Sequence, residues 1–218
     1  MVLKIAAYVL LMGLTTPSTA YTYHLASPFD VTFEERVIID EALTCKNQRG
    51  RQTDPLLLLE ILRMEVRAGI PESIRGMSLA AACSESGYNP NAEGDHKFSK
   101  KRRALAIGLF QQWPWVEKHY GIDRRNPYQA TEAWLFHIVR QVPKTKKKCR
   151  WKGERLWVTA WVRAVRAPDP GGRCYQRPKH YRRLKRWRKR WSKKLRGLYL
   201  SGAIALAQDK DDVVSSLQ

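Results

Sequence analysis

The chain has 218 residues and a mass of 25.3 kDa, the size of one ordinary domain or of one domain with short appendages. Its 40 Lys and Arg residues outnumber its 20 Asp and Glu residues, so the formal net charge is +20. Hydrophobic residues make up 44% of the chain, enough for a packed core, which excludes disorder along its whole length. The excess positive charge predicts an anionic partner: nucleic acid, an acidic membrane surface or an acidic polymer.

The first 20 residues predict a cleaved secretory signal peptide. Lys4 gives a short positive region, residues 5–14 are apolar, and small residues then lead to a cleavage site after Ala20. The apolar run is about half the length that a membrane-spanning helix needs. We therefore expect a periplasmic or secreted protein, and nucleic acid is not its expected partner.

Four cysteines agree with export, because an even number in a secreted chain predicts disulfides. Their spacing contains no C-x-x-C pair, which argues against a zinc site. Three pairings are possible, and we favour one bond in each half of the chain, Cys45–Cys83 and Cys149–Cys174. The alternative is four reduced cysteines that fill the core as small apolar side chains.

The mature region is typical of a series of helices and has no convincing alternating strand pattern. Thr32 and Glu35 form a capping box at the start of the first helix. Prolines and glycines at the boundaries mark most of the others. These expected helices are 56–68, 71–86, 114–120, 128–142, which Pro143 ends, and 153–165. The sequence therefore predicts an all-α domain of about six helices over residues 21–177.

Residues 178–208 form a separate basic segment, because Lys and Arg dominate it up to Gly197. Apolar residues recur there at steps of three and four, which predicts one apolar stripe on a basic helix. The stripe consists of Tyr181, Leu184, Trp187, Trp191, Leu195 and Leu198. It either packs on the core, with the charges in solvent, or lies on an anionic membrane or envelope polymer. Residues 209–218 are expected to be a disordered tail.

The expected helix 71–86 carries the most informative titratable residue, Glu85, near its end. Steps of four, three and four, through Ala81, place Glu85 on the same helical face as Ile74 and Ser78. The helix dipole and partial burial would both disfavour the charged carboxylate there and raise its pKa. A carboxyl group that is protonated near neutral pH is what general-acid catalysis requires. The competing interpretation is an exposed glutamate at a frayed helix end.

Three short motifs follow one another around Glu85. They are E-S-G-Y-N-P-N-A at 85–92, G-L-F-Q at 108–111, and N-P at 126–127, which opens a helix containing Trp134. Together they resemble the catalytic core of the soluble lytic transglycosylase (SLT) family, which belongs to the lysozyme-like superfamily. The resemblance covers roughly residues 55–166, about half of the chain, and implies a lysozyme-like helical fold.

The resemblance also implies a mechanism that uses Glu85 as the only acid and base. Glu85 would protonate the glycosidic oxygen between N-acetylmuramic acid and N-acetylglucosamine, then accept the proton of the muramyl C6 hydroxyl as a 1,6-anhydro ring closes. It implies peptidoglycan glycan strands as the partner, with no metal and no cofactor. Ser86 and Tyr88 match residues that shape the turn after the glutamate, and Phe110 and Gln111 match residues of the sugar cleft. Helix capping and packing are the alternative roles of Ser86 and Tyr88.

Two segments depart from the family pattern. Residues 94–106 form a longer link rich in Lys and Arg, and Gly94 stands where serine is common. The family's Y-N-A-G motif is replaced by W-V-R-A at 161–164. Trp161 therefore cannot donate through a phenol, although its ring could stack on the apolar face of a sugar.

A third departure is the presence of extra carboxylates after Glu85. Glu93 and Asp95 follow it by eight and ten residues. A second carboxylate in the cleft would favour water as the nucleophile, as in a lysozyme. Asp95 could equally be a turn residue, because Gly-Asp pairs favour turns.

These observations leave functions of different classes open. The leading expectation is an exported, monomeric lytic transglycosylase that acts through Glu85. A lysozyme-type hydrolase of the same bond, or a degraded site that only binds peptidoglycan, would share the fold. A nucleic-acid-binding protein would require the N-terminal segment to stay uncleaved. The five histidines show no metal-ligand spacing. The basic run 144–152 is expected to be a solvated loop, although together with the C-terminal helix it could bind anionic envelope polymers or the peptide carboxylates of peptidoglycan.

Overall fold

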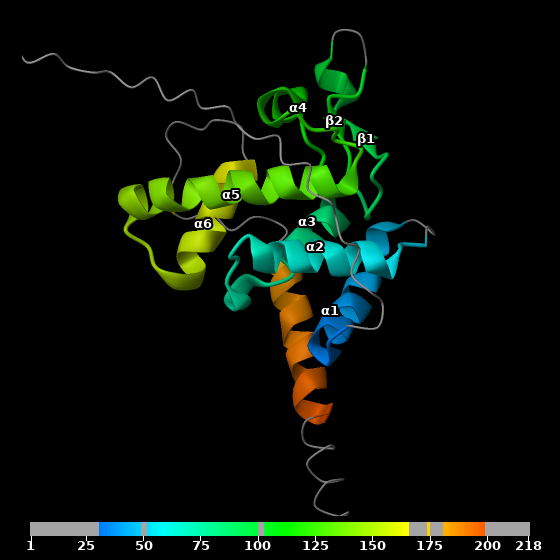
Figure 1. Ribbon diagram of the computed structural model, residues 1–218, viewed down its shortest axis with the longest axis vertical. Coiled ribbons are helices and arrows are strands. Elements are labelled where there is room, and N and C mark those ends of the chain that lie inside the picture. The colour runs from blue at the N-terminus through cyan, green and yellow to red at the C-terminus, as the bar shows by residue number, and fades with distance from the viewer. Residues whose placement is uncertain (1–30, 49–51, 100–102, 166–173, 175–180, 199–218) are drawn as a thin grey trace, which may run out of the picture.

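The computed structural model describes residues 31–48, 52–99, 103–165, 174 and 181–198 (Figure 1). Its helices are α1 (Phe33–Leu43), α2 (Pro55–Arg67), α3 (Met77–Glu85), α4 (Pro114–Tyr120), α5 (Pro127–Cys149), α6 (Gly153–Val165) and a C-terminal helix at 181–198. Short 3-10 turns lie at Lys46–Gln48, Glu72–Ile74 and His96–Phe98, and β1 (Glu93–Gly94) pairs antiparallel with β2 (Ala106–Ile107). The all-α class is confirmed for these residues, apart from this small hairpin. The predicted signal peptide and disordered tail lie outside the described residues.

Helix starts agree with the capping residues read from the sequence. Thr32 and Glu35 form the predicted capping box, with reciprocal hydrogen bonds of 3.1 and 2.9 Å between side chain and backbone. Asp54 and Asn126 cap the helices that begin at Pro55 and Pro127. These starts are predictable because a cap involves only residues that are neighbours in the chain.

The expected continuous helix 71–86 is wrong, because the structure divides it at Gly76. A 3-10 turn comes first, and α3 begins only at Met77, after Gly76 adopts a φ of +83°. A Cβ atom on Gly76 would lie 2.9 Å from the ring of Trp191. The break therefore allows the C-terminal helix to approach the backbone at the start of α3.

The expected end of a helix at Val142 is also wrong. α5 continues through Pro143 to Cys149, where Arg150 ends it at a φ of +55°. α6 packs against α5, the extra turns bury Thr145 and Cys149, and the Cys149–Cys174 disulfide holds their end. Tertiary contacts here outweigh the usual helix-breaking effect of proline. The basic run 144–152, expected to be a loop, is thus helical as far as Cys149, and only residues 150–152 lie in a loop.

α3 lies at the centre of the core. Its residues from Met77 to Cys83 are all buried, and most of them are small, which allows α1 and α2 to pack close to it. Ser84 and Glu85 are only half-buried. Glu85 is therefore the point at which the central helix leaves the core.

A buried carboxylate fixes the start of α3. Glu65, on α2, is 1% exposed and accepts hydrogen bonds from the backbone N–H groups of Gly76 and Ser78 at 2.6 and 2.5 Å. Gly76 has no side chain with which to cap the helix, so Glu65 supplies the cap from a neighbouring helix. Burial raises the pKa of Glu65 to about 7, against the opposing effect of these hydrogen bonds.

We expect this buried carboxyl to make stability depend on pH. Because its pKa in the folded protein lies above the value of 4.5 for a glutamate in the unfolded chain, its contribution is fully present below about pH 4.5 and is lost as pH rises through 7. The free energy of unfolding of the wild type, relative to Glu65→Gln, should fall by about 3 kcal/mol over this range. Urea titrations of both proteins between pH 4 and 8 measure the difference. Parallel profiles would show that Glu65 does not titrate there.

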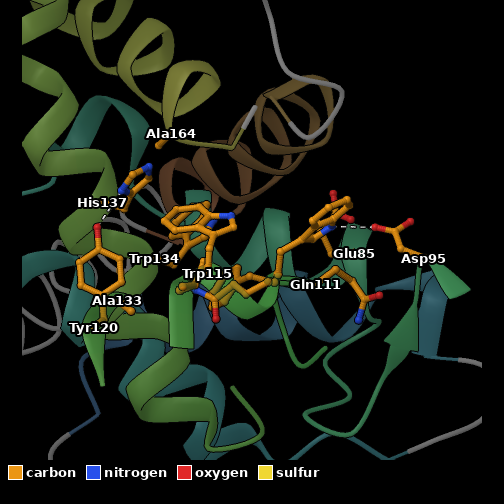
Figure 2. Close-up of a pocket in the computed structure, with 13 residues that line it drawn as sticks. Glu85, Asp95, Gln111, Trp115, Tyr120, Ala133, Trp134, His137 and Ala164 are labelled. Atoms are coloured by element: carbon orange, nitrogen blue, oxygen red, sulfur yellow. Dashed lines mark hydrogen bonds between the residues drawn. The ribbon is translucent and has the colours of Figure 1, made fainter. Parts of the chain in front are cut away.

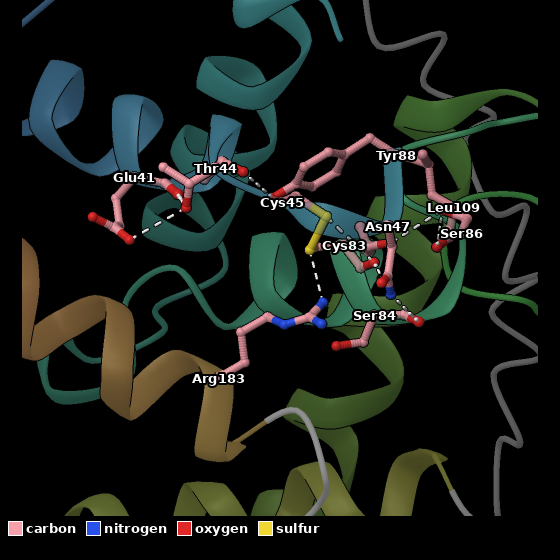
Figure 3. Close-up of a disulfide and its surroundings, with 12 residues drawn as sticks. Glu41, Thr44, Cys45, Asn47, Cys83, Ser84, Ser86, Tyr88, Leu109 and Arg183 are labelled. Carbon is pink, nitrogen blue, oxygen red and sulfur yellow. Dashed lines mark hydrogen bonds between the residues drawn. A yellow bond between two sulfur atoms is a disulfide. The ribbon is translucent and has the colours of Figure 1, made fainter. Parts of the chain in front are cut away.

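A disulfide and an asparagine fix the other end of α3 (Figure 3). Cys45, just after α1, is bonded to Cys83. Two residues along, Asn47 donates from Nδ2 to the carbonyl oxygens of Cys83 and Ser84 at 3.0 and 3.3 Å. Both favoured disulfide pairings are present, so the alternative of four reduced cysteines is wrong. The end of α3 is therefore held in place immediately before Glu85.

The C-terminal helix belongs to the same core and packs beside α1 (Figure 1). Tyr181, Leu184, Trp187 and Trp191 are at most 6% exposed. Of the two interpretations of its apolar stripe, packing on the core is confirmed, and a stripe lying on a membrane is wrong. Leu198, which is 46% exposed, is the exception at the end of the helix. None of the described helices is long and apolar enough to cross a membrane.

Polar contacts add to this packing. Arg190 and Lys194 pair with Glu41, which is 2% exposed. Tyr181 and Arg188 contact Glu154 on α6. Arg183 donates from Nη1 to Sγ of Cys83 at 2.7 Å, next to the disulfide (Figure 3). The helix therefore contacts α1, α3 and α6.

Candidate active site

A cavity of about 260 Å³ lies where the end of α3 meets α4, α5 and the β1–β2 hairpin (Figure 2). Two carboxyl groups, two amide side chains and a wall of aromatic rings give it both polar and apolar surfaces. The residues that line it are Glu85, Asp95, Phe110, Gln111, Gln112, Trp113, Trp115, Val116, Tyr120, Ala133, Trp134, His137 and Ala164.

The two carboxylates lie at one end of this cavity (Figure 2). Glu85 is the last residue of α3, and Asp95 follows β1 with a φ of +58°. Asp95 accepts a hydrogen bond from Nε1 of Trp113 at 2.9 Å, which fixes its orientation. The cavity can therefore offer two carboxyl groups to the same ligand.

The wall of the cavity is aromatic. Trp113 and Trp115 are 39% and 43% exposed, which is unusual for indole rings and leaves their faces open to a ligand. Phe110 stacks on Trp134 with ring centroids 4.6 Å apart. Aromatic faces of this kind suit the apolar faces of sugar rings.

The end of the cavity away from Glu85 is polar without being charged (Figure 2). The hydroxyl of Tyr120 lies 2.7 Å from Nδ1 of His137, and the ring of Trp115 meets His137 edge-on. Burial lowers the pKa of His137 and raises that of Tyr120, so both are neutral at pH 7. This end is therefore suited to uncharged hydroxyl or amide groups.

Gln111, in the loop that precedes α4, forms hydrogen bonds with backbone atoms at both ends of the β1–β2 hairpin. Its Nε2 donates to the carbonyl oxygens of Ala92 and Gly108, both at 3.1 Å. A Cβ atom on Gly94 would lie 2.4 Å from Oε1 of Gln111. The glycine that departs from the family pattern is thus the residue against which Gln111 packs.

The structure brings together only some of the residues predicted for the site. Glu85, Asp95, Phe110 and Gln111 line the cavity. Ser86, Tyr88 and Trp161 do not, and their contacts assign them a supporting role.

Ser86 and Tyr88 hold the turn after α3. The Ser86 hydroxyl lies within hydrogen-bond distance of the carbonyl oxygens of Ala82 and Leu109, at 3.1 and 2.9 Å. Tyr88 is 4% exposed and donates to the carbonyl oxygen of Ala42 at 3.2 Å. Burial raises the pKa of its hydroxyl, which stays protonated. These contacts are those of capping and packing residues, and neither Ser86 nor Tyr88 lines the cavity.

Stacking of Trp161 on a sugar is also wrong, because its side chain is completely buried. It meets Trp134 edge-on, with ring centroids 6.0 Å apart. Trp161 therefore supports the ring that Phe110 stacks on. From the W-V-R-A motif, only Ala164 lines the cavity.

Sequence reasoning missed the residues of α4 and α5 that complete the site. Trp113, Trp115 and Tyr120 come from the start and end of α4, and His137 from the middle of α5. The available signal was the W-P-W run at 113–115, where a helix start displays two indole rings.

Within the described ranges, no three His, Cys, Asp or Glu side chains gather as a metal site requires.

Comparisons of the chain with protein-family models, with curated proteins and with solved structures found no match. The residues of this cavity therefore carry the argument for function.

Proposed function

We propose that this protein is an exported enzyme that cleaves peptidoglycan glycan strands as a lytic transglycosylase. The observation that supports the proposal most strongly is the position of Glu85. It is the last residue of the central buried helix α3, and it lines a cavity that also contains exposed indole rings. The resemblance to the SLT family assigns the catalytic role to the same residue. A helical core whose glutamate faces a small hairpin is consistent with a lysozyme-like fold.

The chemistry needs one well-positioned carboxyl group. Glu85 gives its proton to the glycosidic oxygen as the bond to C1 of the muramyl residue breaks. The resulting carboxylate then takes the proton of the C6 hydroxyl, whose oxygen bonds to C1 and closes the 1,6-anhydro ring. The anchoring of α3 by Glu65 and by the Cys45–Cys83 bond supports such a role, because acid–base catalysis depends on fixed geometry.

The remainder of the cavity suits an uncharged glycan. The exposed faces of Trp113 and Trp115 can stack on pyranose rings. The neutral pair of Tyr120 and His137 can hydrogen-bond to hydroxyl or acetamido groups. The two disulfides fit an oxidising compartment, where peptidoglycan is found.

A second candidate is a lysozyme-type hydrolase, and one observation favours it. Asp95 lines the same cavity as Glu85. A carboxylate in this place could activate water or stabilise the positive charge that develops at C1. The hydrogen bond that Trp113 donates to Asp95 orients this carboxyl group at the cavity.

Replacing Asp95 by asparagine separates the two candidates. If Glu85 is the only acid and base, Asp95→Asn should retain activity to within about 10-fold, since it removes no proton-transfer step. Release of soluble fragments from purified sacculi measures the rate. If the protein is a hydrolase that uses Asp95, the rate should instead fall by at least about 100-fold. That result would favour the lysozyme-type hydrolase over the transglycosylase.

A further inference from the structure

The outward face of the C-terminal helix carries a regular stripe of cations. They follow one another at steps of four, three, four and three residues, so they lie on one helical face about 21 Å long. All of them are exposed. This cationic stripe consists of Arg182, Arg186, Lys189, Lys193 and Arg196.

The cationic stripe lies opposite the buried apolar stripe. At 100° per residue, its mean direction is about 170° from that of Tyr181, Leu184, Trp187 and Trp191. The buried stripe fixes the helix on the core, so the cations point into solvent from a rigid base. No apolar residue accompanies them on this face, which is therefore built for charge and not for insertion into a bilayer.

Among the described residues, three of the basic ones beside the cationic stripe pair with carboxylates, whereas the stripe residues do not. Arg188, Arg190 and Lys194 pair with the carboxylates of Glu154 and Glu41. In the part of the chain that the structure describes, none of the five stripe residues pairs with a carboxylate. Like charges at these spacings repel one another and destabilise the helix by about 0.2–0.5 kcal/mol per neighbouring pair. An anionic ligand would relieve this repulsion.

We propose that the cationic stripe binds a linear phosphodiester polymer of the cell envelope. A straight row of cations on one helix matches the shape of a linear polyanion better than it matches a broad anionic surface such as a membrane. Three of the five residues are arginines, whose guanidinium groups form paired hydrogen bonds with phosphate oxygens. The C-terminal helix lies at the opposite end of the molecule from α4 and the hairpin (Figure 1), so a bound polymer would leave the cavity open.

Poly(glycerol phosphate) binding to a stripe variant and to a control of equal charge tests this proposal. The stripe variant is Arg186→Gln/Lys189→Gln/Lys193→Gln, and the control is Lys146→Gln/Lys147→Gln/Lys148→Gln at the exposed end of α5. Each of the three stripe cations should contribute a salt-dependence slope of about −0.7. The stripe variant should therefore bind about 100-fold more weakly at ~0.1 M salt, with a slope shallower by about 2. Its melting temperature should equal or exceed that of the wild type, because repulsion is removed.

Three results would overturn the proposal. Equal weakening in the stripe variant and the α5 control would mean that net charge alone is responsible. Absence of wild-type binding to the polymer at ~0.1 M salt would remove the ligand class. Binding to phosphatidylglycerol vesicles without binding to the polymer would assign the stripe to a membrane surface. None of these results depends on whether Glu85 is catalytic.

Discussion

Replacing Glu85 by glutamine is expected to abolish cleavage of peptidoglycan while leaving the fold intact. Glutamine has nearly the same shape but cannot give a proton to the glycosidic oxygen, and general acid–base catalysis is worth about 100- to 10,000-fold in rate. Glu85 lies at the boundary of the core and is half-buried, so its removal should change stability little. The rate of fragment release from sacculi and a thermal melt of the same preparation measure both quantities.

Glu93→Gln provides the matched control for Glu85→Gln. Glu93 lies eight residues further along, in β1, and pairs with Arg125 at 2.5 Å on the exposed side of the hairpin. This hydrogen bond lowers its pKa, so it is ionised and cannot act as an acid near neutral pH. The control should cleave at close to the wild-type rate. Full activity of Glu85→Gln, or equal losses in both variants, would contradict the role of Glu85.

Replacing Trp191 by alanine should destabilise the whole protein, although Trp191 lies in the basic segment 178–208, outside the predicted catalytic domain. Its ring is 5% exposed and packs against the backbone of Gly76, where α3 begins. Removal of a buried tryptophan costs about 3–5 kcal/mol. At 2–4 °C per kcal/mol for a chain of this size, the melting temperature should fall by about 6–20 °C. Thermal melts followed by circular dichroism measure it.

Trp115→Ala makes the same chemical change at a surface position. The Trp115 ring is 43% exposed at the cavity, so its loss should change the melting temperature little. If Trp191→Ala melted at the same temperature as Trp115→Ala, the C-terminal helix would be an accessory to the fold and not part of its core. The present structure predicts the reverse, and predicts that deletion of residues 181–198 unfolds the domain.

Much of the fold could be predicted because its signals are local. The Thr32–Glu35 capping box and the Asp54 and Asn126 caps depend on residues within one turn of each other. The errors arose where distant segments decide the backbone. Gly76 interrupts a helix because Trp191 approaches it, and α5 continues past Pro143 because α6 packs on it.

The site was predictable to a smaller extent and for the same reason. The motifs identified Glu85, Phe110 and Gln111 together with their order in the chain. They could not show which side chains point into the cavity, because Tyr88 turns into the core through a φ of +63°. The contributions of α4 and α5, such as Tyr120 and His137, depend on helix packing that no sequence spacing specifies.

The most direct test of the central claim is mass spectrometry of the muropeptides that the wild-type protein releases from purified sacculi. We expect products that end in 1,6-anhydro-N-acetylmuramic acid, each lighter by one water molecule than the hydrolytic product, and no such products from Glu85→Gln. Products with reducing ends would contradict the transglycosylase mechanism and point to Asp95. Release of no product at all would contradict an enzymatic role and favour a protein that binds glycan without cleaving it.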